Sequence, residues 1–330
     1  MTDPGPKIVL DLIEAFRRSK SMFAAVALGV FDSLAEGPKT AAQLGGDPDA
    51  MTRLLDACVC LGLLVRDGGL YRNTPVAVTY LVRSSAKTMT GYILYSNAAL
   101  FRLWTHLEDA VREGSNRWSQ AFGWDGPIFD NFFKTDQATH DFLLGMNGFG
   151  VLSSPAVVAA FDLSRFRRLV DLGGATGHLP IAACERYPSL SAAVFDLPRV
   201  IASVRGFVAG TRVELIEGDF FTDELPPADL YSLGQILHDW TEGRIRRLLA
   251  RIHQRLPAGG GLLIAERLLD DDKLGPLPTL MQSLNMLVCT EGKERTAGEY
   301  EALLGEAGFA RVESRRTDTP RDAVLALKAS

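Results

Sequence analysis

The sequence predicts an α/β protein in which a helical N-terminal domain precedes an open, mostly parallel sheet. From about residue 163 onward, short apolar runs alternate with helix-like segments, which is typical of strands joined by crossover helices. The first 100 residues lack this alternation, and their apolar residues recur at helical spacing. A length of 330 residues, with 47% hydrophobic and 23% charged residues, is sufficient for two globular domains.

Residues 1–100 are expected to form a winged-helix-like domain. Apolar residues at helical spacing run through Ile8–Leu34, and shorter helical segments follow at Lys39–Leu44 and Ala50–Leu64. Val65–Asn73 then predicts a small hairpin that turns at Asp67-Gly68-Gly69. Three helices followed by a hairpin are the winged-helix order.

The candidate recognition helix of this domain is poorly suited to DNA. Residues 49–64 carry one basic residue, Arg53, against two acidic ones, Asp49 and Asp56. The net charge of the chain is −5, whereas nucleic-acid binding requires a basic surface. We therefore expect no nucleic-acid partner and a homodimer in which this domain buries its apolar face in the second subunit. A DNA-binding regulator is the alternative.

Residues 101–162 are expected to form a helical linker that also covers a ligand pocket. The stretch is rich in aromatic side chains, which fill cores and also line pockets for flat ligands. The aromatic residues are Phe101, Trp104, Trp118, Phe122, Trp124, Phe129, Phe132 and Phe133.

The sequence is expected to belong to a cytoplasmic protein without a membrane partner. We find no secretory signal, and we expect no apolar stretch long enough to cross a bilayer. The four cysteines lack the paired spacing of zinc sites. Cys58 and Cys60 fall in an apolar helix, where buried thiols are expected.

The C-terminal domain, residues 163–330, is expected to place its ligand at one edge of its sheet. Strands are predicted near 169–172, 192–196, 213–217, 229–234 and 261–266, with a final antiparallel pair near 310–316 and 322–328. Because the carboxyl ends of parallel strands share an edge, the side chains that follow these strands are candidate ligand contacts.

The segment Leu169–Gly177, LVDLGGATG, is the strongest cofactor signal. It predicts a buried strand, a tight glycine turn and the start of a helix. A dinucleotide motif starting at Gly173 fails, because its later glycines would have to be Ala175 and His178. The segment instead favours S-adenosylmethionine, whose carboxylate can use backbone N–H groups and whose positive side can face Asp171. An ordinary strand–helix turn is the alternative.

Acidic residues follow the next two strands. Asp196 ends the second apolar run, where a carboxylate can accept hydrogen bonds from both ribose hydroxyls; a turn aspartate before Pro198 is the alternative. Gly218-Asp219-Phe220 ends the third run, where the acid can accept from an adenine amino group and the aromatic ring can pack on its face. Together these strand ends predict one nucleoside site.

Three further residues predict a general base on the same edge. His238 follows the fourth strand, Glu266 ends the fifth, and Glu294 lies beyond the helix that carries Asn285. An imidazole with two orienting carboxylates can take the proton from a phenol, whose pKa is about 10, and an unperturbed histidine titrates near neutrality. The alternatives are a structural histidine and two exposed glutamates.

Motifs of one known family run through nearly the whole chain. They include Leu28–Asp32, Leu54–Asp56, Tyr71–Thr74, Ala110–Gly114, Ala160–Ser164, Asp171–Gly174, Val194–Pro198, Glu217–Phe221, Leu237–Trp240, Ser283–Val288 and Thr290–Thr296. On these motifs the chain resembles the acetylserotonin (hydroxyindole) O-methyltransferase family, within the plant-type class I S-adenosylmethionine-dependent O-methyltransferases.

The resemblance implies a class I methyltransferase with a Rossmann-like sheet that binds S-adenosylmethionine, and a homodimer whose N-terminal helices interlock. It also assigns a base with two flanking acids, a set of cofactor contacts and a set of substrate contacts. These are, in turn, His238 with Glu266 and Glu294; Asp196 with Gly218–Phe220; and Asp239 with Asn285.

Five positions depart from the family pattern. Ala175 replaces a frequent Gly, Gln235 replaces an Arg near the cofactor, and Cys289 replaces a Gln that touches the indole. Gly150 replaces a Trp beside the cofactor, and Phe133 replaces a Tyr. We retain Gln235 as a predicted cofactor contact and Cys289 as a predicted substrate contact.

The sequence therefore predicts an S-adenosylmethionine-dependent O-methyltransferase that methylates a hydroxyl of a small aromatic molecule, with an N-acetylserotonin-like hydroxyindole as a candidate acceptor. No metal is expected, because the sulfonium is already activated and His238 supplies the base. The alternatives are a non-catalytic, cofactor-binding regulatory dimer and a C- or N-methyltransferase of secondary metabolism.

Overall fold

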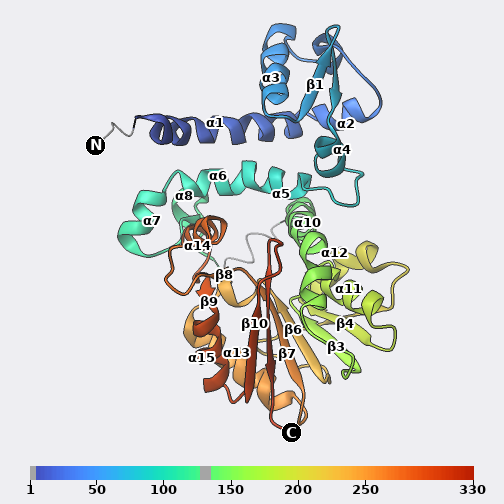
Figure 1. Cartoon of the computed structure of the whole chain (residues 1–330), viewed down its shortest axis with the longest axis vertical. Helices are drawn as coiled ribbons and strands as arrows, with labels where there is room; N and C mark the ends of the chain where they lie inside the picture. The colour runs from blue at the N-terminus through green and yellow to red at the C-terminus, as the bar shows by residue number, and fades with distance from the viewer. Residues whose placement is uncertain (1–4, 127–134) are drawn as a thin grey trace. The chain divides into compact units, whose positions relative to one another are not determined.

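The computed structural model describes residues 5–126 and 135–330, apart from the side chains of residues 136–138. The chain forms two compact units, Met1–Ala99 and Leu100–Ser330 (Figure 1). The further boundary predicted near residue 162 falls within the second unit and remains a prediction.

The N-terminal unit consists of helices around a two-stranded hairpin. Its described elements are α1 (Lys7–Ala27), α2 (Val30–Ala35), η1 (Ala41–Leu44), α3 (Pro48–Cys60), β1 (Leu64–Asp67), β2 (Leu70–Asn73), α4 (Pro75–Tyr80), α5 (Thr90–Tyr95) and the π-helical turn η2 (Ser96–Leu100). Buried side chains from α1, α2, α3 and the hairpin form its core, among them Val26, Phe31, Leu55 and Tyr71.

Three helix predictions in this unit need correction. The helix expected over Ala50–Leu64 is α3, which ends at Cys60, and Leu64 already begins β1. The helix expected over Ile8–Leu34 is two helices, because Gly29 has a left-handed backbone, with φ of 69°, which ends α1 and begins α2. Of the helix expected over Lys39–Leu44, only η1 is helical, since Lys39 pairs through its backbone with Tyr71 of β2.

The hairpin turns where the sequence predicts. Gly68 and Gly69 have φ of 52° and 81°, the positive values that a two-residue hairpin turn requires. Asp56 of α3 accepts hydrogen bonds from Arg66 at 2.9 Å and from the Tyr71 hydroxyl at 2.7 Å. This acid of the candidate recognition helix therefore ties α3 to the hairpin.

The cysteine side chains are free thiols. Cys58 is buried, as expected, but Cys60 is exposed, so the expectation that both are buried is wrong for Cys60. Cys60 is the last residue of α3 and lies beyond the stripe of the helix that faces the core, which ends with Cys58.

The C-terminal unit contains a seven-stranded sheet between two layers of helices (Figure 1). Its described helices are α6 (Phe101–Trp104), α7 (Leu107–Glu113), α8 (Trp118–Phe122), α10 (Asp136–Ala159), α11 (His178–Arg186), α12 (Pro198–Val208), η3 (Leu237–Asp239), α13 (Glu242–Arg255), α14 (Leu277–Cys289) and α15 (Ala297–Glu306). Its strands are β3 (Arg168–Leu172), β4 (Ser191–Asp196), β5 (Val213–Glu217), β6 (Leu230–Gly234), β7 (Gly261–Glu266), β8 (Leu268–Leu269), β9 (Arg295–Thr296), β10 (Arg311–Arg315) and β11 (Asp322–Leu327).

The strand order of the large sheet is β10-β11-β7-β6-β3-β4-β5. Strand β11 pairs antiparallel with both β10 and β7, and the other neighbouring strands pair parallel. The chain winds from β3 outward to β5, then returns to β6 on the other side of β3. The order therefore reverses between β3 and β6, which is where open α/β sheets bind ligands, at the carboxyl ends of the strands. All seven predicted strands of this sheet are observed within one residue of their predicted bounds.

The sheet is covered on both faces. One core cluster joins it to α13 and α15, and the other joins it to α11, α12 and the end of α10. Since both faces are buried, the central strands are apolar along their whole length, which is why they were recognisable in the sequence. The short parallel pair β8–β9 was not predicted.

Helix α10 corrects one expectation. By length and composition, its segment Thr139–Ala159 would be able to cross a membrane, although we expected no such stretch. However, 44% of its most apolar window is buried inside the protein, and the helix packs against α11 and α12. This packing accounts for its apolar composition.

Candidate active site

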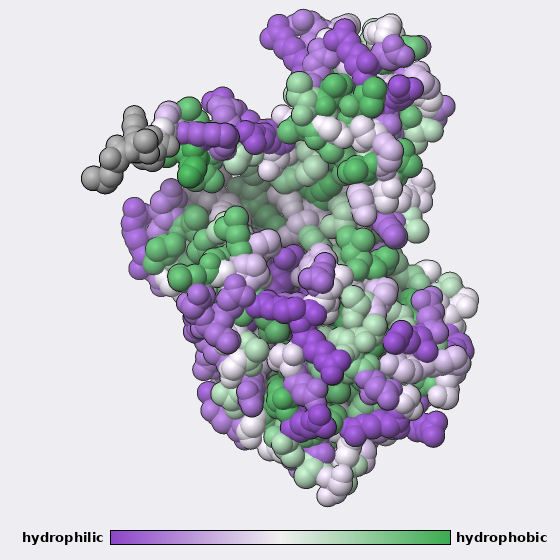
Figure 2. Space-filling model, in the orientation of Figure 1, coloured by the Kyte–Doolittle hydropathy of each residue, from purple (hydrophilic) through white to green (hydrophobic). Residues whose placement is uncertain are grey.

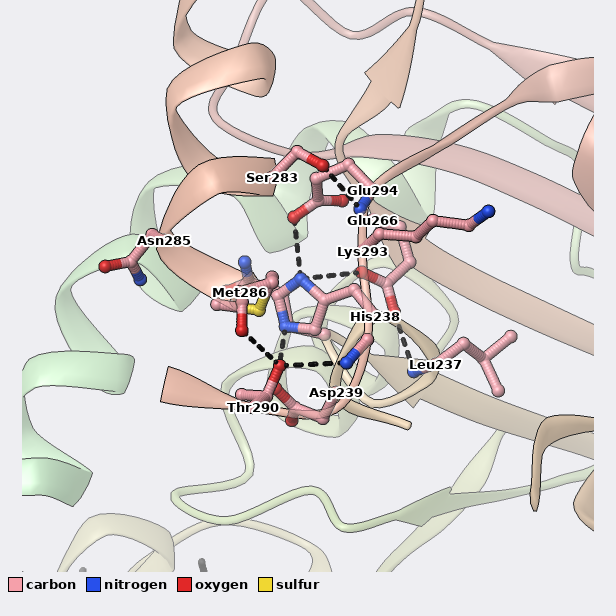
Figure 3. A network of polar contacts seen from close by, with 12 residues as sticks. Leu237, His238, Asp239, Glu266, Ser283, Asn285, Met286, Thr290, Lys293 and Glu294 are labelled. Atoms are coloured by element: carbon pink, nitrogen blue, oxygen red, sulfur yellow. Dashed lines mark hydrogen bonds and ion pairs between the residues drawn. The ribbon is translucent and has the colours of Figure 1, made fainter. Parts of the chain in front are cut away.

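His238, Glu266 and Glu294 meet at the carboxyl edge of the sheet (Figure 3). His238 lies on η3, the short turn after β6, whereas Glu266 ends β7 and Glu294 precedes β9. The Nδ1 atom of His238 lies 2.7 Å from Glu294 Oε1 and 3.5 Å from Glu266 Oε2. The structure thus brings together three residues that the sequence assigned to one site from different strand ends.

Glu266 holds the turn that carries the histidine. Its Oε1 atom accepts hydrogen bonds from the backbone N–H groups of Ile236 and Leu237, each at 3.0 Å. Because Glu266 is the last residue of β7, these bonds fix the turn after β6 against the neighbouring strand. Glu266 is therefore both a structural anchor of the turn and a charge beside the imidazole.

Glu294 reaches His238 from the loop between α14 and β9. The loop passes very close to the histidine backbone: a Cβ atom at Gly292 would lie 2.1 Å from the carbonyl oxygen of His238. The Glu294 N–H donates to Ser283 Oγ of α14 at 3.4 Å. Glycine at position 292 thus permits the approach that puts a carboxylate on Nδ1.

The cluster is almost closed to solvent. His238 is 4% exposed, Glu266 0% and Glu294 1%, so the alternative that these glutamates are exposed surface charges is wrong. Burial by itself lowers the pKa of His238, but the negative charges of Glu266, Glu294 and Asp239 outweigh it and raise this pKa to about 10. The expectation of titration near neutrality is therefore corrected: His238 is cationic at pH 7.

The same three side chains have the spacing of metal ligands. One ligand atom from each lies within 4.8 Å of the others. In the structure, however, His238 Nδ1 is bonded to Glu294, and Glu266 Oε1 is occupied by two backbone N–H groups. The absence of a metal requirement remains a prediction.

The predicted substrate contacts lie around this cluster on η3 and α14. Asp239 Oδ1 is 3.6 Å from His238 Nε2, on the side of the ring opposite Glu294. Asn285 Oδ1 accepts a hydrogen bond from the Trp104 indole at 2.9 Å, and Figure 3 shows it apart from the histidine. Cys289 is buried, and its thiol donates to the Asn285 carbonyl at 2.5 Å within α14. Asp239 therefore borders the base directly, whereas the hydrogen bonds described for the other two go to different partners.

The predicted cofactor turn follows β3. Gly173 has φ of 71°, and a Cβ there would lie 2.6 Å from Ile236 Cδ1. A Cβ at Gly174 would lie 2.5 Å from Asp171 Oδ2, so the turn can fold back over this acid. Burial raises the pKa of Asp171 to about 7, although its bond from Ser232 Oγ at 2.6 Å opposes the shift.

The predicted nucleoside residues meet beside this turn. Asp196 Oδ2 accepts from the Ala175 N–H at 2.9 Å, and the Gly218 N–H donates to the Asp196 carbonyl at 2.9 Å. The Phe220 ring lies 3.2 Å from the position of a Gly173 Cβ, and Asp219 is partly exposed next to it. Burial raises the pKa of Asp196 to about 6. One continuous edge thus carries all these residues.

Comparison with known proteins identifies the chain. The family model described as an O-methyltransferase domain matches residues 104–310, and one described as an O-methyltransferase dimerisation domain matches residues 10–83. The chain belongs to the O-methyltransferase family. The predicted family, the α/β fold class and the enzyme class are thereby confirmed, as is the methyl donor S-adenosylmethionine that the family uses.

Individual relatives agree over their full lengths. Acetylserotonin O-methyltransferase from Bos taurus is 44% identical over 338 residues, which cover 98% of each chain. The structure of human N-acetylserotonin methyltransferase in complex with S-adenosylmethionine superimposes with a TM-score of 0.96, at 38% identity over 99% of each chain. The mitomycin 7-O-methyltransferase MmcR gives a TM-score of 0.85 at 26% identity, over 98% of this chain and 97% of the other.

The structure shows the local backbone or packing at two of the departures from the family pattern in this O-methyltransferase. Ala175 replaces a frequent glycine and has φ of 46°, a backbone that glycine adopts more easily. A Cβ at Gly150 would lie 2.0 Å from the His178 ring, so this ring occupies the space beside Gly150 in α10. Phe133 lies outside the described residues.

Sequence reasoning missed Arg321 and His178 on the cofactor edge. The predicted contact Gln235 follows β6, and its side-chain oxygen accepts a hydrogen bond from Arg321. Arg321 directly precedes β11, and the start of an antiparallel strand lies at the edge where the parallel strands end. The predicted antiparallel pair was therefore the signal that would have found Arg321.

Proposed function

We propose that this O-methyltransferase transfers a methyl group from S-adenosylmethionine to a hydroxyl of a small aromatic molecule, and that the acceptor is an N-acetylserotonin-like hydroxyindole. The observation that carries the proposal is the buried imidazole of His238 between two carboxylates, beside a glycine turn and three cofactor-edge acids. The names of the bovine and human relatives support the acceptor class. A buried imidazole between two carboxylates argues against a purely regulatory, cofactor-binding dimer.

The base chemistry follows from which nitrogen of His238 is free. Nδ1 is engaged by Glu294, whereas Nε2 has Asp239 Oδ1 at 3.6 Å, beyond hydrogen-bond distance. The sulfonium of the donor supplies an activated methyl group. Unprotonated Nε2 takes the phenolic proton as the new C–O bond forms and the S–C bond breaks, and Glu266 and Glu294 stabilise the imidazolium that results.

We assign the cofactor edge by the same chemistry. Asp196 accepts from the ribose hydroxyls, and Asp219 with Phe220 holds the adenine. Asp171, whose Oδ2 lies at the Gly174 turn, faces the positive amino-acid end. These roles rest on the position of each acid along one sheet edge.

We also propose a homodimer built by the N-terminal unit, in a cytoplasmic setting that keeps the four free cysteines reduced. The matched dimerisation domain supports the dimer. Several apolar side chains at the start of α1 are more than half exposed in the single chain: Ile8, Val9, Leu10, Leu12, Ile13 and Phe16. Figure 2 shows both apolar and hydrophilic side chains along this helix, as expected of a surface that a second chain covers on one side.

The central test is methylation of N-acetylserotonin by His238→Gln. We expect kcat to fall by about 10²–10⁴-fold with nearly unchanged affinity for S-adenosylhomocysteine, because only the proton acceptor is lost. The matched control is His140→Gln, at an exposed position of α10. Near-parental turnover by His238→Gln would refute the base role, and methylation at nitrogen or carbon would refute the acceptor assignment. Activity that survives a chelator would support the prediction that no metal is required.

A further inference from the structure

Arg321 lies across the carboxyl edge of the sheet. The next residue, Asp322, begins β11 and pairs with Glu266, the last residue of β7. From this edge the guanidinium reaches toward the reversal point of the strand order. Its Nη2 donates to the side-chain oxygen of Gln235 after β6, and its Nη1 lies 3.4 Å from His178 Nε2 at the start of α11. The cation thus bridges the ends of β6 and of the β3–α11 turn.

The charge of Arg321 is buried and has no direct counter-ion. The residue is 3% exposed. Among the side chains that the structure describes, which exclude those of residues 127–134 and 136–138, no carboxylate oxygen lies within 4.0 Å of its guanidinium, and its Nε–H has no hydrogen-bond partner. Burial lowers its pKa to about 10, which leaves it cationic at neutral pH. The charges of Glu266 and Asp171 act on the guanidinium only from beyond 4.0 Å and partly oppose the effect of burial. Since a buried charge without a directly bonded counter-ion is costly, this arrangement favours an anionic ligand.

The two residues that contact Arg321 directly hold the guanidinium without neutralising it. Burial lowers the pKa of His178 well below its usual value, so this imidazole is neutral at pH 7. Its Nδ1 lies 2.8 Å from Ser154 Oγ, and with the proton on Nδ1 the Nε2 atom accepts from Arg321. Gly150 leaves the space that the His178 ring fills. Two neutral acceptors, Gln235 and His178, therefore orient the cation.

We infer that Arg321 binds the α-carboxylate at the amino-acid end of S-adenosylmethionine. This inference rests on the proposed function, since it concerns the same cofactor site. The other assigned contacts, Asp171, Asp196 and Asp219, are acids and suit the amine and hydroxyl donors of the cofactor. The α-carboxylate can accept from backbone N–H groups of the glycine turn, but none of these acids can bind it, whereas a guanidinium with free N–H groups can do so through two parallel hydrogen bonds. Arg321 reaches this edge beside Asp171, which faces the amine.

The test compares two ligands by calorimetry: S-adenosylhomocysteine and its decarboxylated analogue, S-adenosyl-3-thiopropylamine, which lacks only the carboxylate. In the unaltered protein, S-adenosylhomocysteine is expected to bind about 10- to 100-fold more tightly than the analogue. Arg321→Gln is expected to lower the affinity for S-adenosylhomocysteine by about the same factor, and the affinity for the analogue by less than about 3-fold. The control Arg315→Gln, on β10 with its side chain 54% exposed, is expected to change neither.

Equal affinities of the unaltered protein for the two ligands would overturn the inference, as would equal losses for both ligands in Arg321→Gln. Arg321→Lys keeps the buried charge but not the planar fork, and we expect it to lose an intermediate part of the preference. If Arg321→Gln does not fold, this variant decides: an unchanged preference in Arg321→Lys would overturn the inference. Failure of the unaltered protein to bind S-adenosylhomocysteine would instead refute the proposed function.

Discussion

Replacing Glu294 by glutamine changes the charge beside His238 while keeping an oxygen that can accept from Nδ1. Glu294 Oε1 lies 2.7 Å from that nitrogen in a site that solvent hardly reaches. An opposite charge at this distance shifts a pKa by about 1–3 units. We therefore expect the pKa of His238, about 10 in the unaltered protein, to fall to roughly 7–9 in Glu294→Gln.

The sign of the effect on activity depends on pH. Only the unprotonated imidazole accepts the phenolic proton, so kcat/KM should rise with pH and level off near the pKa of the free enzyme. With a pKa of about 10, the unprotonated fraction at pH 7 is on the order of 10⁻³. Glu294→Gln raises the unprotonated fraction, but it makes His238 a weaker proton acceptor and holds its ring less firmly. The activity deficit of the variant should therefore grow as pH rises.

The assay is kcat/KM for N-acetylserotonin from pH 6 to pH 10. The matched control is Glu291→Gln, in the same loop, whose partly exposed carboxylate pairs with Arg244 3.7 Å away and should leave the profile unchanged. A plateau that begins near pH 6.5 in the unaltered enzyme would refute the reasoning. So would identical profiles for the unaltered enzyme and Glu294→Gln.

Three further predictions test the cofactor edge, the catalytic loop and the dimer. Asp196→Ala should cost about 1.5–3 kcal/mol of S-adenosylhomocysteine affinity by calorimetry, and an unchanged affinity would remove Asp196 from the ribose site. Gly292→Ala would put a Cβ atom 2.1 Å from the carbonyl oxygen of His238, so this variant should have a lower Tm and a lower kcat. In the control Gly298→Ala, the nearest atom to the new Cβ lies 3.9 Å away, so Tm and kcat should not fall. In ultracentrifugation at micromolar concentration the chain should be a dimer that Phe16→Asp weakens and Val111→Asp does not; a stable, unaltered monomer would contradict this.

The large sheet could be predicted from the sequence because each central strand is buried on both faces. An apolar run such as Leu169–Leu172 is continuous for this reason, and its end at a glycine turn marks the ligand edge. The same logic placed Asp196 and Glu266 at strand ends, where parallel strands bring their carboxyl ends together. Periodicity and turn chemistry are local, so one sequence was enough to predict them.

The exact ends of the helices and the protonation state of His238 could not be predicted from local sequence patterns in this way. The break at Gly29 is a glycine stop that the helical periodicity of Ile8–Leu34 obscured, whereas the bridge between Lys39 and Tyr71 joins two segments that are distant in the chain. The pKa of His238 depends on charges from three separate segments, of which Glu294 lies 56 residues away. An apolar helix such as α10 has the composition of a membrane span until its packing is known.

By itself, the sequence determined the fold class, the edge of the sheet that binds ligands and the residues that meet at the base, since these follow from strand order and from what each strand ends on. Only the tertiary structure decided the protonation of His238 and the place of Arg321. Arg321 is far from the glycine turn in the chain, and antiparallel pairing of β11 with β7 brings it to the same edge. Both features depend on burial and on charges from distant segments, which spacing along one chain does not encode.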